Sequence, residues 1–234
     1  MFPFNDFFPP EIVAFVSERP ADFTLQNFQD PFSVKQKKYL ADILGPAYPN
    51  VFNIRQVHGA DVLIVSPTRF PYKEIPQADG TLTKFVDFPL AVRTADCLPV
   101  FIYDPVKKAI GLVHAGWRGS RQKVVVHAVK LMREKWRTKP QDLKVAFGPA
   151  IQSCCYEVER RFKRYFPKAV IERSGRYYLD LPKVNRDQLL KAGVKAKNIY
   201  DRRLCTCGDP QFFSYRRDGP SAGRMISVLM MKSV

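Results

Sequence analysis

Short apolar segments of strand character alternate with helical segments along the whole chain, and no boundary separates them. The sequence contains no Gly/Ser-rich linker, no low-complexity tract and no repeat of fixed period. Intermixed strands and helices are typical of α/β folds, in which both kinds of element share one core. We therefore expect residues 1–234 to form a single α/β domain with a mixed β-sheet core flanked by helices.

Hydrophobic periodicity and turn residues predict where the elements of this domain lie. Strands are predicted at residues 12–17, 51–57, 62–65, 90–94, 99–103, 110–114, 143–147, 198–202, 211–215 and 225–231. Helices are predicted from Asp30-Pro31 to about Leu44, from Ser120 onward, over 157–165 and over 181–191. The helix after Ser120 has the clearest pattern, because its apolar residues recur on one helix face.

The net charge of +16 is carried by the second half of the chain. Residues 1–117 hold 11 Lys and Arg against 12 Asp and Glu, whereas residues 118–234 hold 27 against 10. Such a field attracts anions, for example nucleic acid, an acidic membrane surface or a phosphorylated small molecule. Helices with Lys and Arg on their solvated faces would explain the same excess, and this is the default interpretation.

The sequence indicates a cytoplasmic protein without membrane contact. The first 20 residues carry Asp6 and Glu18 and lack a basic segment before an apolar core, unlike a secretory signal. No apolar run approaches the ~18 residues that a membrane-spanning helix needs. Five cysteines, two of them adjacent, suit reduced thiols better than a disulfide framework.

Three residues with metal-binding side chains follow predicted strands. His58 and Cys97 come shortly after apolar segments, and His114 stands where a strand runs into a glycine-rich turn. Side chains at strand ends can converge at one edge of a sheet. Two imidazoles and one thiolate match a catalytic zinc site, which keeps a fourth position open for water. The alternative is a buried cysteine with two turn histidines that hydrogen-bond to the backbone.

Other cysteines and a glycine-rich turn are weaker candidates for a functional site. Adjacent Cys154 and Cys155 are not expected to place both sulfurs on one ion, and Cys205 and Cys207 have no histidine nearby. We interpret these four thiols as structural or as incidental redox groups. The turn at 116–119 lacks the spacing of a nucleotide-binding loop, but it opens a helix, so its N–H groups and Arg118 could hold an anion.

Seven ordered motifs resemble one protein family. They are Arg55–Gly59, Ala78–Gly80, Thr94–Pro99, Val113–Gly119, Gly148–Ile151, Cys205-Thr206, and Phe212–Asp218 with Gly223–Met225. Together they resemble the laccase-domain family, also called multicopper polyphenol oxidases or purine nucleoside phosphorylases, which includes the bacterial peptidoglycan editing factor. The resemblance runs from about residue 11 to 231.

The resemblance implies a single α/β domain with a metal pocket at strand ends. The family's metal-binding residues would fall on His58, Cys97 and His114. It also implies phosphorolysis of adenosine, inosine, guanosine or methylthioadenosine, and hydrolytic deamination of adenosine. A chain with three histidines cannot build a trinuclear copper cluster, so we favour Zn²⁺ over copper and nucleoside chemistry over laccase chemistry.

The substrates imply further residue roles. For deamination, a zinc-bound hydroxide would attack C6 of adenine while Asp96 or Asp79 moves protons, although a turn-capping role explains Asp96 equally well. For phosphorolysis, phosphate would attack C1′, so the site must hold an anion. The candidates for binding substrate are Arg55, Gln56, Arg118, Arg216, Arg217 and Arg224. We expect about two of these five arginines to lie near the pocket.

Three other functions fit the same sequence. A hydrolase that removes L-Ser from the nucleotide-sugar precursor UDP-MurNAc-L-Ser would use the same metal water. A basic nucleic-acid-binding module would use the charge of residues 118–234, but the motifs favour a small anion over nucleic acid. A noncatalytic structural domain would bind no metal.

Overall fold

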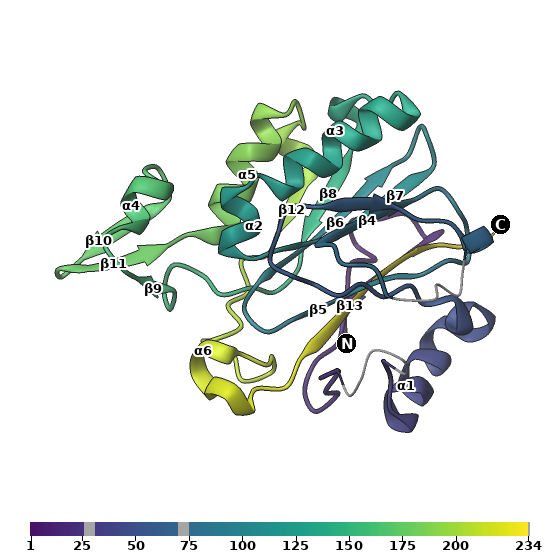
Figure 1. Cartoon of the computed structure of the whole chain (residues 1–234), viewed down its shortest axis with the longest axis horizontal. Helices are drawn as coiled ribbons and strands as arrows, with labels where there is room; N and C mark the ends of the chain where they lie inside the picture. The colour runs from purple at the N-terminus through teal and green to yellow at the C-terminus, as the bar shows by residue number, and fades with distance from the viewer. Residues whose placement is uncertain (26–30, 70–74, 234) are drawn as a thin grey trace.

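The strands form three sheets in the computed structural model, which describes residues 1–25, 31–69 and 75–233 (Figure 1). The largest sheet is mixed and has the order β12 (Ile199–Asp201), β8 (Lys144–Phe147), β6 (Leu98–Asp104), β7 (Ala109–Ala115), β4 (Gly80–Thr83) and β3 (Val62–Ile64). The second has the order β1 (Phe2–Pro3), β2 (Ile12–Val16), β13 (Met225–Met231) and β5 (Leu90–Thr94). The third has the order β10 (Val170–Arg173), β11 (Arg176–Leu179) and β9 (Glu157–Val158).

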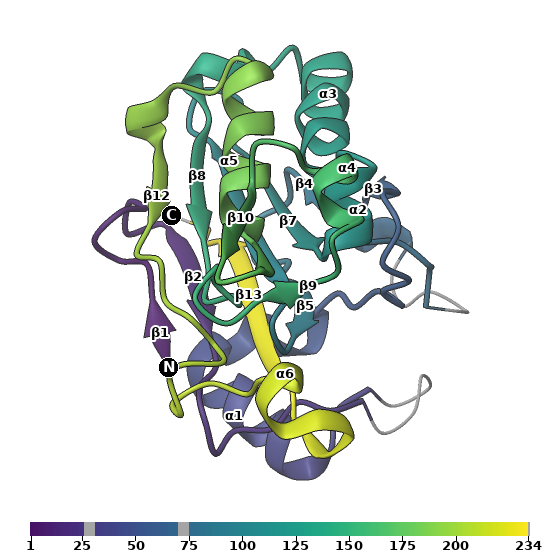
Figure 2. The same ribbon diagram turned by 90° about the vertical axis from the view of Figure 1, so that its left-hand side faces the viewer.

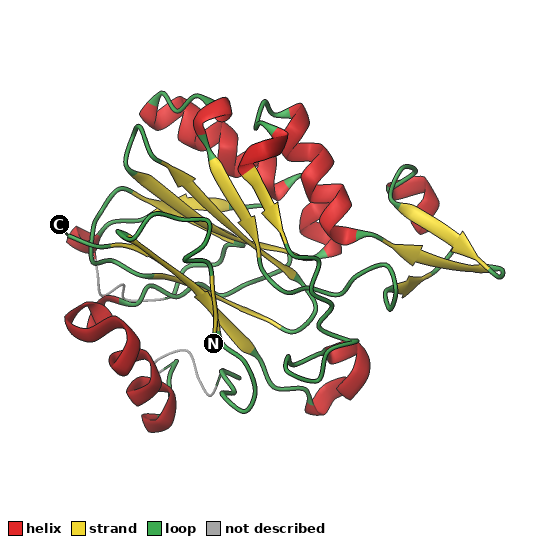
Figure 3. Ribbon diagram, turned by 180° about the vertical axis from the view of Figure 1, so that it is seen from behind, coloured by secondary structure: helices red, strands yellow, loops and turns green. Residues whose placement is uncertain are grey.

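Helices cover the outer faces of the two larger sheets. The α-helices are α1 (Val34–Leu44), α2 (Trp117–Arg121), α3 (Val124–Trp136), α4 (Phe162–Tyr165), α5 (Leu181–Lys191) and α6 (Tyr215–Asp218). Short 3₁₀ turns span Gly45–Asn50, Pro67–Arg69, Pro140–Asp142, Ala196–Asn198 and Gly219–Ser221. Helices α2, α3 and α5 lie on the six-stranded sheet, the four-stranded sheet lies beneath it, and α1 covers the far side (Figures 1 and 3). The expected mixed α/β fold is confirmed.

Strand β6 is apolar at nearly every position because both of its faces are buried. Val100 and Ile102 pack into the core beneath α3, whereas Phe101 and Tyr103 pack into the core between the two sheets. Successive side chains of a strand point to opposite faces, so one apolar run serves two cores. The six-stranded sheet is therefore a layer with hydrophobic contacts on both sides.

Strand β13 has the same property in the other sheet. Leu229 faces the core between the sheets, and Ile226 and Val228 face the core under α1, where Leu40 packs. Strand β13 pairs with both β2 and β5 in antiparallel register. It therefore joins segments from the two ends of the sequence into one sheet.

Residues 157–179 form an arm that projects from the rest of the molecule (Figures 1 and 2). We expected a helix over 157–165, and this prediction is wrong for its first half. Glu157 and Val158 instead pair with β11, opposite Tyr178 and Tyr177, and only Phe162–Tyr165 is helical. A strand partner some 20 residues away in the sequence overrides the local helical pattern, because it pairs the backbone groups of Glu157 and Val158.

Other predicted elements also differ from the structure. The helix predicted from Ser120 is two helices, because Lys123 takes a left-handed conformation (φ 63°) between α2 and α3. The first helix begins at Val34 behind a Ser33 cap, and Asp30 lies outside the described residues. The strand predicted at 51–57 is not formed; these residues make isolated bridges and single hydrogen bonds with other segments.

The segment 211–215 is not a strand. Phe212 and Phe213 are buried in the core between the two larger sheets, and Ser214 caps α6 by accepting a hydrogen bond from the Arg217 N–H. The predicted strands at 198–202 and 225–231 exist as β12 and β13, but they belong to different sheets. Among the described residues, no helix has the length and apolar character needed to cross a membrane.

We predict that Phe101→Ala lowers the free energy of unfolding by about 3–5 kcal/mol, because it opens a cavity between the two sheets. Phe101 is completely buried, with its ring centroid 4.7 Å from that of Phe4. Urea denaturation followed by circular dichroism measures the change. Phe85→Ala is the control, since Phe85 is 42% exposed and its loss should cost under about 1 kcal/mol. Equal effects of the two substitutions would contradict this description of the core.

Candidate active site

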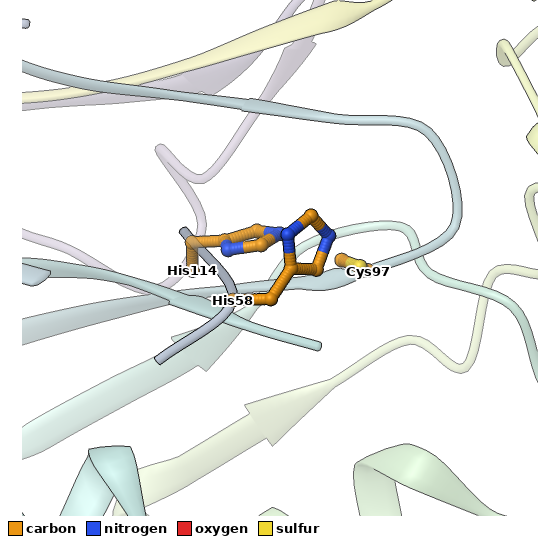
Figure 4. A group of neighbouring side chains, drawn as sticks. All are labelled: His58, Cys97 and His114. Atoms are coloured by element: carbon orange, nitrogen blue, oxygen red, sulfur yellow. The ribbon is translucent and has the colours of Figure 1, made fainter. Parts of the chain in front are cut away.

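His58, Cys97 and His114 meet at one edge of the six-stranded sheet (Figure 4). Their ligand atoms all lie within 4.8 Å of one another, and the two imidazole rings are 4.9 Å apart at 84°. Cys97 immediately precedes β6, and His114 is near the end of the antiparallel strand β7, where it pairs with Pro99. Antiparallel pairing brings the beginning of β6 beside the end of β7, which explains why these two side chains are neighbours.

The carboxylate of Asp79 holds two of these residues in place. It accepts hydrogen bonds from the backbone N–H groups of Val57 (3.3 Å), His58 (3.0 Å) and Gly59 (2.6 Å). It also lies 2.8 Å from Nδ1 of His114. With Nδ1 occupied, Nε2 of His114 is the ring nitrogen left for a metal ion. The three N–H contacts also stabilise the left-handed backbone of His58 (φ 58°).

Close packing around the three side chains requires glycine at two neighbouring positions. A Cβ atom on Gly116 would lie 3.0 Å from Sγ of Cys97 and 3.2 Å from Cδ2 of His58. A Cβ on Gly119 would lie 2.6 Å from the carbonyl oxygen of Gly59. The start of α2 thus fits directly against the His58 loop and helps to fix the distance between His58 and Cys97.

Cys97 and His114 perturb the pKa of one another. Burial raises the pKa of the Cys97 thiol, but the charge of His114 and hydrogen bonds from both imidazoles outweigh it and lower the pKa to about 6. Burial lowers the pKa of His114, but the Cys97 thiolate and the Asp79 hydrogen bond raise it to about 9. Between these pH values the metal-free protein holds a thiolate beside an imidazolium. A thiolate is the form of cysteine that binds metals.

The three side chains lie in a cleft of about 630 Å³. Its polar lining includes Arg55, Gln56, Arg93, Asp96, Arg216 and Arg224. Its apolar and aromatic lining includes Leu25, Ile54, Ile151, Tyr156 and Tyr215. A cleft of this size with apolar walls and several cationic groups suits a small, partly anionic organic molecule.

Asp96 lines the cleft and organises its wall. Its Oδ1 accepts a hydrogen bond from Oγ1 of Thr206 (2.7 Å), and its Oδ2 accepts one from the backbone N–H of Arg216 (2.6 Å). Asp79, the other carboxylate expected to move protons, is completely buried and does not line the cleft. Asp79 is therefore a positioning residue for His114, and of these two expected carboxylates Asp96 is the one within reach of a ligand.

Three of the candidate substrate-binding arginines line the cleft. Arg55 belongs to a segment that forms a bridge with Gln77, Arg216 donates to the carbonyl oxygen of Glu157 (2.7 Å), and Arg224 donates to that of Gly223 (3.0 Å). Arg55 is far from Arg216 and Arg224 in the sequence. The fold therefore gathers cations from both halves of the chain at one site.

Two predicted arginines lie elsewhere. The guanidinium of Arg217 pairs with Asp218 and donates to the carbonyl oxygens of Thr206 and Phe212, among others. Arg118 lies 4.6 Å above the ring of Trp117 and is exposed. Neither is part of the cleft lining. Arg217 supports loops, and Arg118 covers the start of α2.

Sequence reasoning found Gln56 but missed Arg93 and Tyr156, which also line the cleft. Arg93 is nearly buried in β5, and its guanidinium donates to Asn53 Oδ1 (3.0 Å) and to the carbonyl oxygen of Phe23 (2.8 Å). Gln56 exchanges two hydrogen bonds of 2.8 Å with the backbone of Arg93. A single charge in an otherwise apolar strand was the available signal for Arg93. Tyr156 carried no comparable signal, and burial raises its pKa.

The fold and the cleft together define an α/β protein with a candidate metal centre of two histidines and one cysteine. The chain belongs to the family described as multi-copper polyphenol oxidoreductase laccase, whose model matches residues 21–232. This confirms the resemblance seen in the sequence motifs.

Relatives of known name cover most of the chain. It is 35% identical to purine nucleoside phosphorylase YlmD of Geobacillus stearothermophilus over 84% of this chain and 77% of that protein. It is 37% identical to a purine nucleoside phosphorylase of Xylella fastidiosa strain 9a5c, over 79% and 73%. The crystal structure of YlmD from G. stearothermophilus superposes with a TM-score of 0.86 at 31% identity, covering 96% of this chain and 93% of that one.

We predict that the affinity for Zn²⁺ rises about tenfold per pH unit between pH values of about 6 and 9, because the ion must displace one proton from His114. Below the pKa of Cys97 the slope should steepen, since a second proton is then displaced. Competition with a chromophoric chelator measures the affinity, and Cys97→Ser protein supplies the background. An affinity that is flat over this range would contradict a site built on His114.

Proposed function

We propose that this protein is a zinc-dependent purine nucleoside phosphorylase that also deaminates adenosine. The observation that carries the proposal is the cleft itself, where two imidazoles and a thiolate lie beside four arginines and two tyrosines. The names of its relatives support phosphorolysis. Adenosine, inosine, guanosine and methylthioadenosine are the proposed nucleosides, with inorganic phosphate as the second substrate.

The donor set suits zinc better than copper clusters. Two imidazoles and one thiolate leave one of four tetrahedral positions for a substrate or water. The chain's three histidines are too few for a multicopper centre, and one of them, His127, hydrogen-bonds to the carbonyl of Ala60 3.0 Å away. When bound here, zinc would supply Lewis acidity and a water of lowered pKa.

The cleft residues have separate proposed roles in binding the two substrates. Tyr156, Tyr215 and Ile151 offer flat or apolar surfaces for a purine ring. Arg216 and Arg224 offer guanidinium groups to phosphate, for which paired N–H donors are well suited. Arg55 contributes a further cation at the side of the cleft that holds His58.

In phosphorolysis a phosphate oxygen forms a bond to C1′ as the bond from C1′ to the purine nitrogen breaks. The electron pair of that bond leaves with the purine, which then gains a proton. In deamination water adds at C6 and ammonia leaves. We assign the proton transfers to Asp96, whose carboxylate faces the cleft and keeps lone pairs beyond the two hydrogen bonds it accepts.

The proposal includes a cytoplasmic location, where nucleosides, phosphate and reduced thiols occur together. The five cysteines are free thiols in the structure, as reducing conditions require.

Cys97→Ser should lower both activities at least about a hundredfold while leaving the fold intact, because Lewis-acid assistance contributes several kcal/mol to such reactions. Adenosine incubated with phosphate should give adenine and ribose 1-phosphate with the wild-type protein, and inosine without phosphate. Chromatography of the products measures both rates. Cys207→Ser is the matched control, because Cys207 lies outside the cleft lining.

Retained turnover in Cys97→Ser protein would remove the metal from the proposal. Release of serine from UDP-MurNAc-L-Ser, without nucleoside cleavage, would favour the editing hydrolase instead. Tight and steeply salt-dependent binding of DNA or RNA, without turnover, would favour the nucleic-acid module.

Arg216→Ala should raise the KM for phosphate about tenfold to a hundredfold, the cost of losing a charge-assisted hydrogen bond. Arg118→Ala should leave this KM nearly unchanged, because Arg118 covers Trp117 outside the cleft. Initial rates at varied phosphate concentration measure both values. A larger effect of Arg118→Ala would mean that phosphate binds at the start of α2 instead.

A further inference from the structure

Three cysteines from two distant loops meet outside the cleft. Sγ of Cys154 lies 3.4 Å from Sγ of Cys155 and 3.4 Å from Sγ of Cys205, and all three sulfurs lie within 4.8 Å of one another. The sequence led us to expect that the adjacent cysteines could not serve one ion. That expectation overlooked Cys205, which the fold brings to the same place from 50 residues away.

Backbone contacts hold the two loops together before any ligand arrives. Ala150 forms a parallel bridge with Cys205, and the N–H of Thr206 donates to the carbonyl of Ala150 at 3.2 Å. The side-chain amide of Gln152 donates to the carbonyls of Ala150 (3.2 Å) and Leu204 (3.3 Å). These contacts fix the backbone that carries Cys205 relative to the loop that carries Cys154 and Cys155.

The environment of Cys205 suits a bound thiolate, and the cluster is open to solvent. The backbone N–H of Gln152 points at Sγ of Cys205 over 3.5 Å. Cys154 is exposed, and Cys155 and Cys205 are partly exposed, so an ion can enter from solvent.

We propose that Cys154, Cys155 and Cys205 form a second metal site, which takes one soft monovalent cation such as Cu⁺ in three-coordinate geometry. Three sulfurs at ~2.3 Å from one ion in a plane lie ~4.0 Å apart. Two of the observed separations are 3.4 Å, and all three sulfurs lie within 4.8 Å of one another, so small side-chain adjustments suffice to bind the ion. Thiolates are the ligands that Cu⁺ prefers.

The number of ligands distinguishes this ion from zinc. Among the described residues, no fourth His, Cys, Asp or Glu joins the group, whereas a structural zinc site almost always has four protein ligands. Binding transfers no electrons. Each thiol that binds as a thiolate releases one proton, so up to three protons leave per ion.

The proposed site adjoins the cleft wall without sharing its ligands. Tyr156, which lines the cleft, follows Cys155 directly. Thr206, which donates to Asp96, follows Cys205 directly. An ion held by the three sulfurs would therefore fix the two segments that position Tyr156 and Asp96.

Anaerobic titration of fully reduced protein with Cu⁺, against a chromophoric Cu⁺ chelator, tests the proposal. Cys97→Ser protein serves as the background, so that the cleft does not contribute its own sulfur. We expect one Cu⁺ per chain, and X-ray absorption should find three sulfur neighbours.

Adding Cys205→Ser to the background protein should weaken Cu⁺ binding by more than ~100-fold. Loss of a residue that only orients a metal ligand costs ~10–100-fold, so a larger loss indicates a direct ligand. Cys154→Ser, at the exposed position, should do the same with little effect on folding. Cys207→Ser is the matched control, because Cys207 is a partly exposed thiol of the same loop outside the group. Its binding should match the background protein.

Four results would overturn the proposal. The first is the absence of Cu⁺ binding in the background protein. The second is an equal loss of binding in the Cys207→Ser protein. The third is a disulfide between two of the three thiols even in protein purified anaerobically. Such a disulfide would prevent Cu⁺ binding and would make the cluster a redox pair. Preference for Zn²⁺ with a fourth, non-sulfur neighbour would refute the three-coordinate geometry.

Discussion

The carboxylate of Asp79 is the interaction on which the candidate active site depends. It is completely buried, and its hydrogen bonds connect three consecutive N–H groups of the His58 loop with the ring of His114. Burial raises the pKa of a carboxyl group, but the contacts with His114 and the backbone N–H groups outweigh this and keep the pKa of Asp79 low. A neutral Asp79 would leave those donors facing a weaker acceptor, so the charge of one buried side chain sets the position of two candidate ligands.

The two-sided burial of the sheets gives this arrangement its rigidity. Strands β6 and β7 are packed on both faces, and Cys97 and His114 are attached to the same end of this pair. The backbone at the end of such a strand has little freedom to move, so the side chain attached there keeps its position. The loops that complete the cleft, around Thr24 and Arg216, come from the periphery of the fold and pack against this fixed edge.

The sequence predicts most of the elements and the three candidate ligands, but not how distant segments meet. Strand β13 and helix α5 follow from local patterns, because burial on two faces or along one stripe leaves a clear periodicity. The candidate ligands stand out through residue type and their position after strands. The contact between Cys154 and Cys205, and the burial of Asp79 beneath His114, depend on pairings between residues far apart in the chain. Local patterns carry no information about such pairings, and the helix expected at 157–165 failed for the same reason.

The position of β13 has a consequence for how the protein is made. Strand β13 lies between β2 and β5. During synthesis, the edges of β2 and β5 that pair with β13 therefore remain unpaired until residues 225–231 have left the ribosome. The apolar faces of β2 and β5 stay without their central partner for the same period. The nascent chain would accordingly need protection from aggregation late in translation, and a stop codon before Met225 would release a polypeptide in which β2 and β5 each keep an unpaired edge.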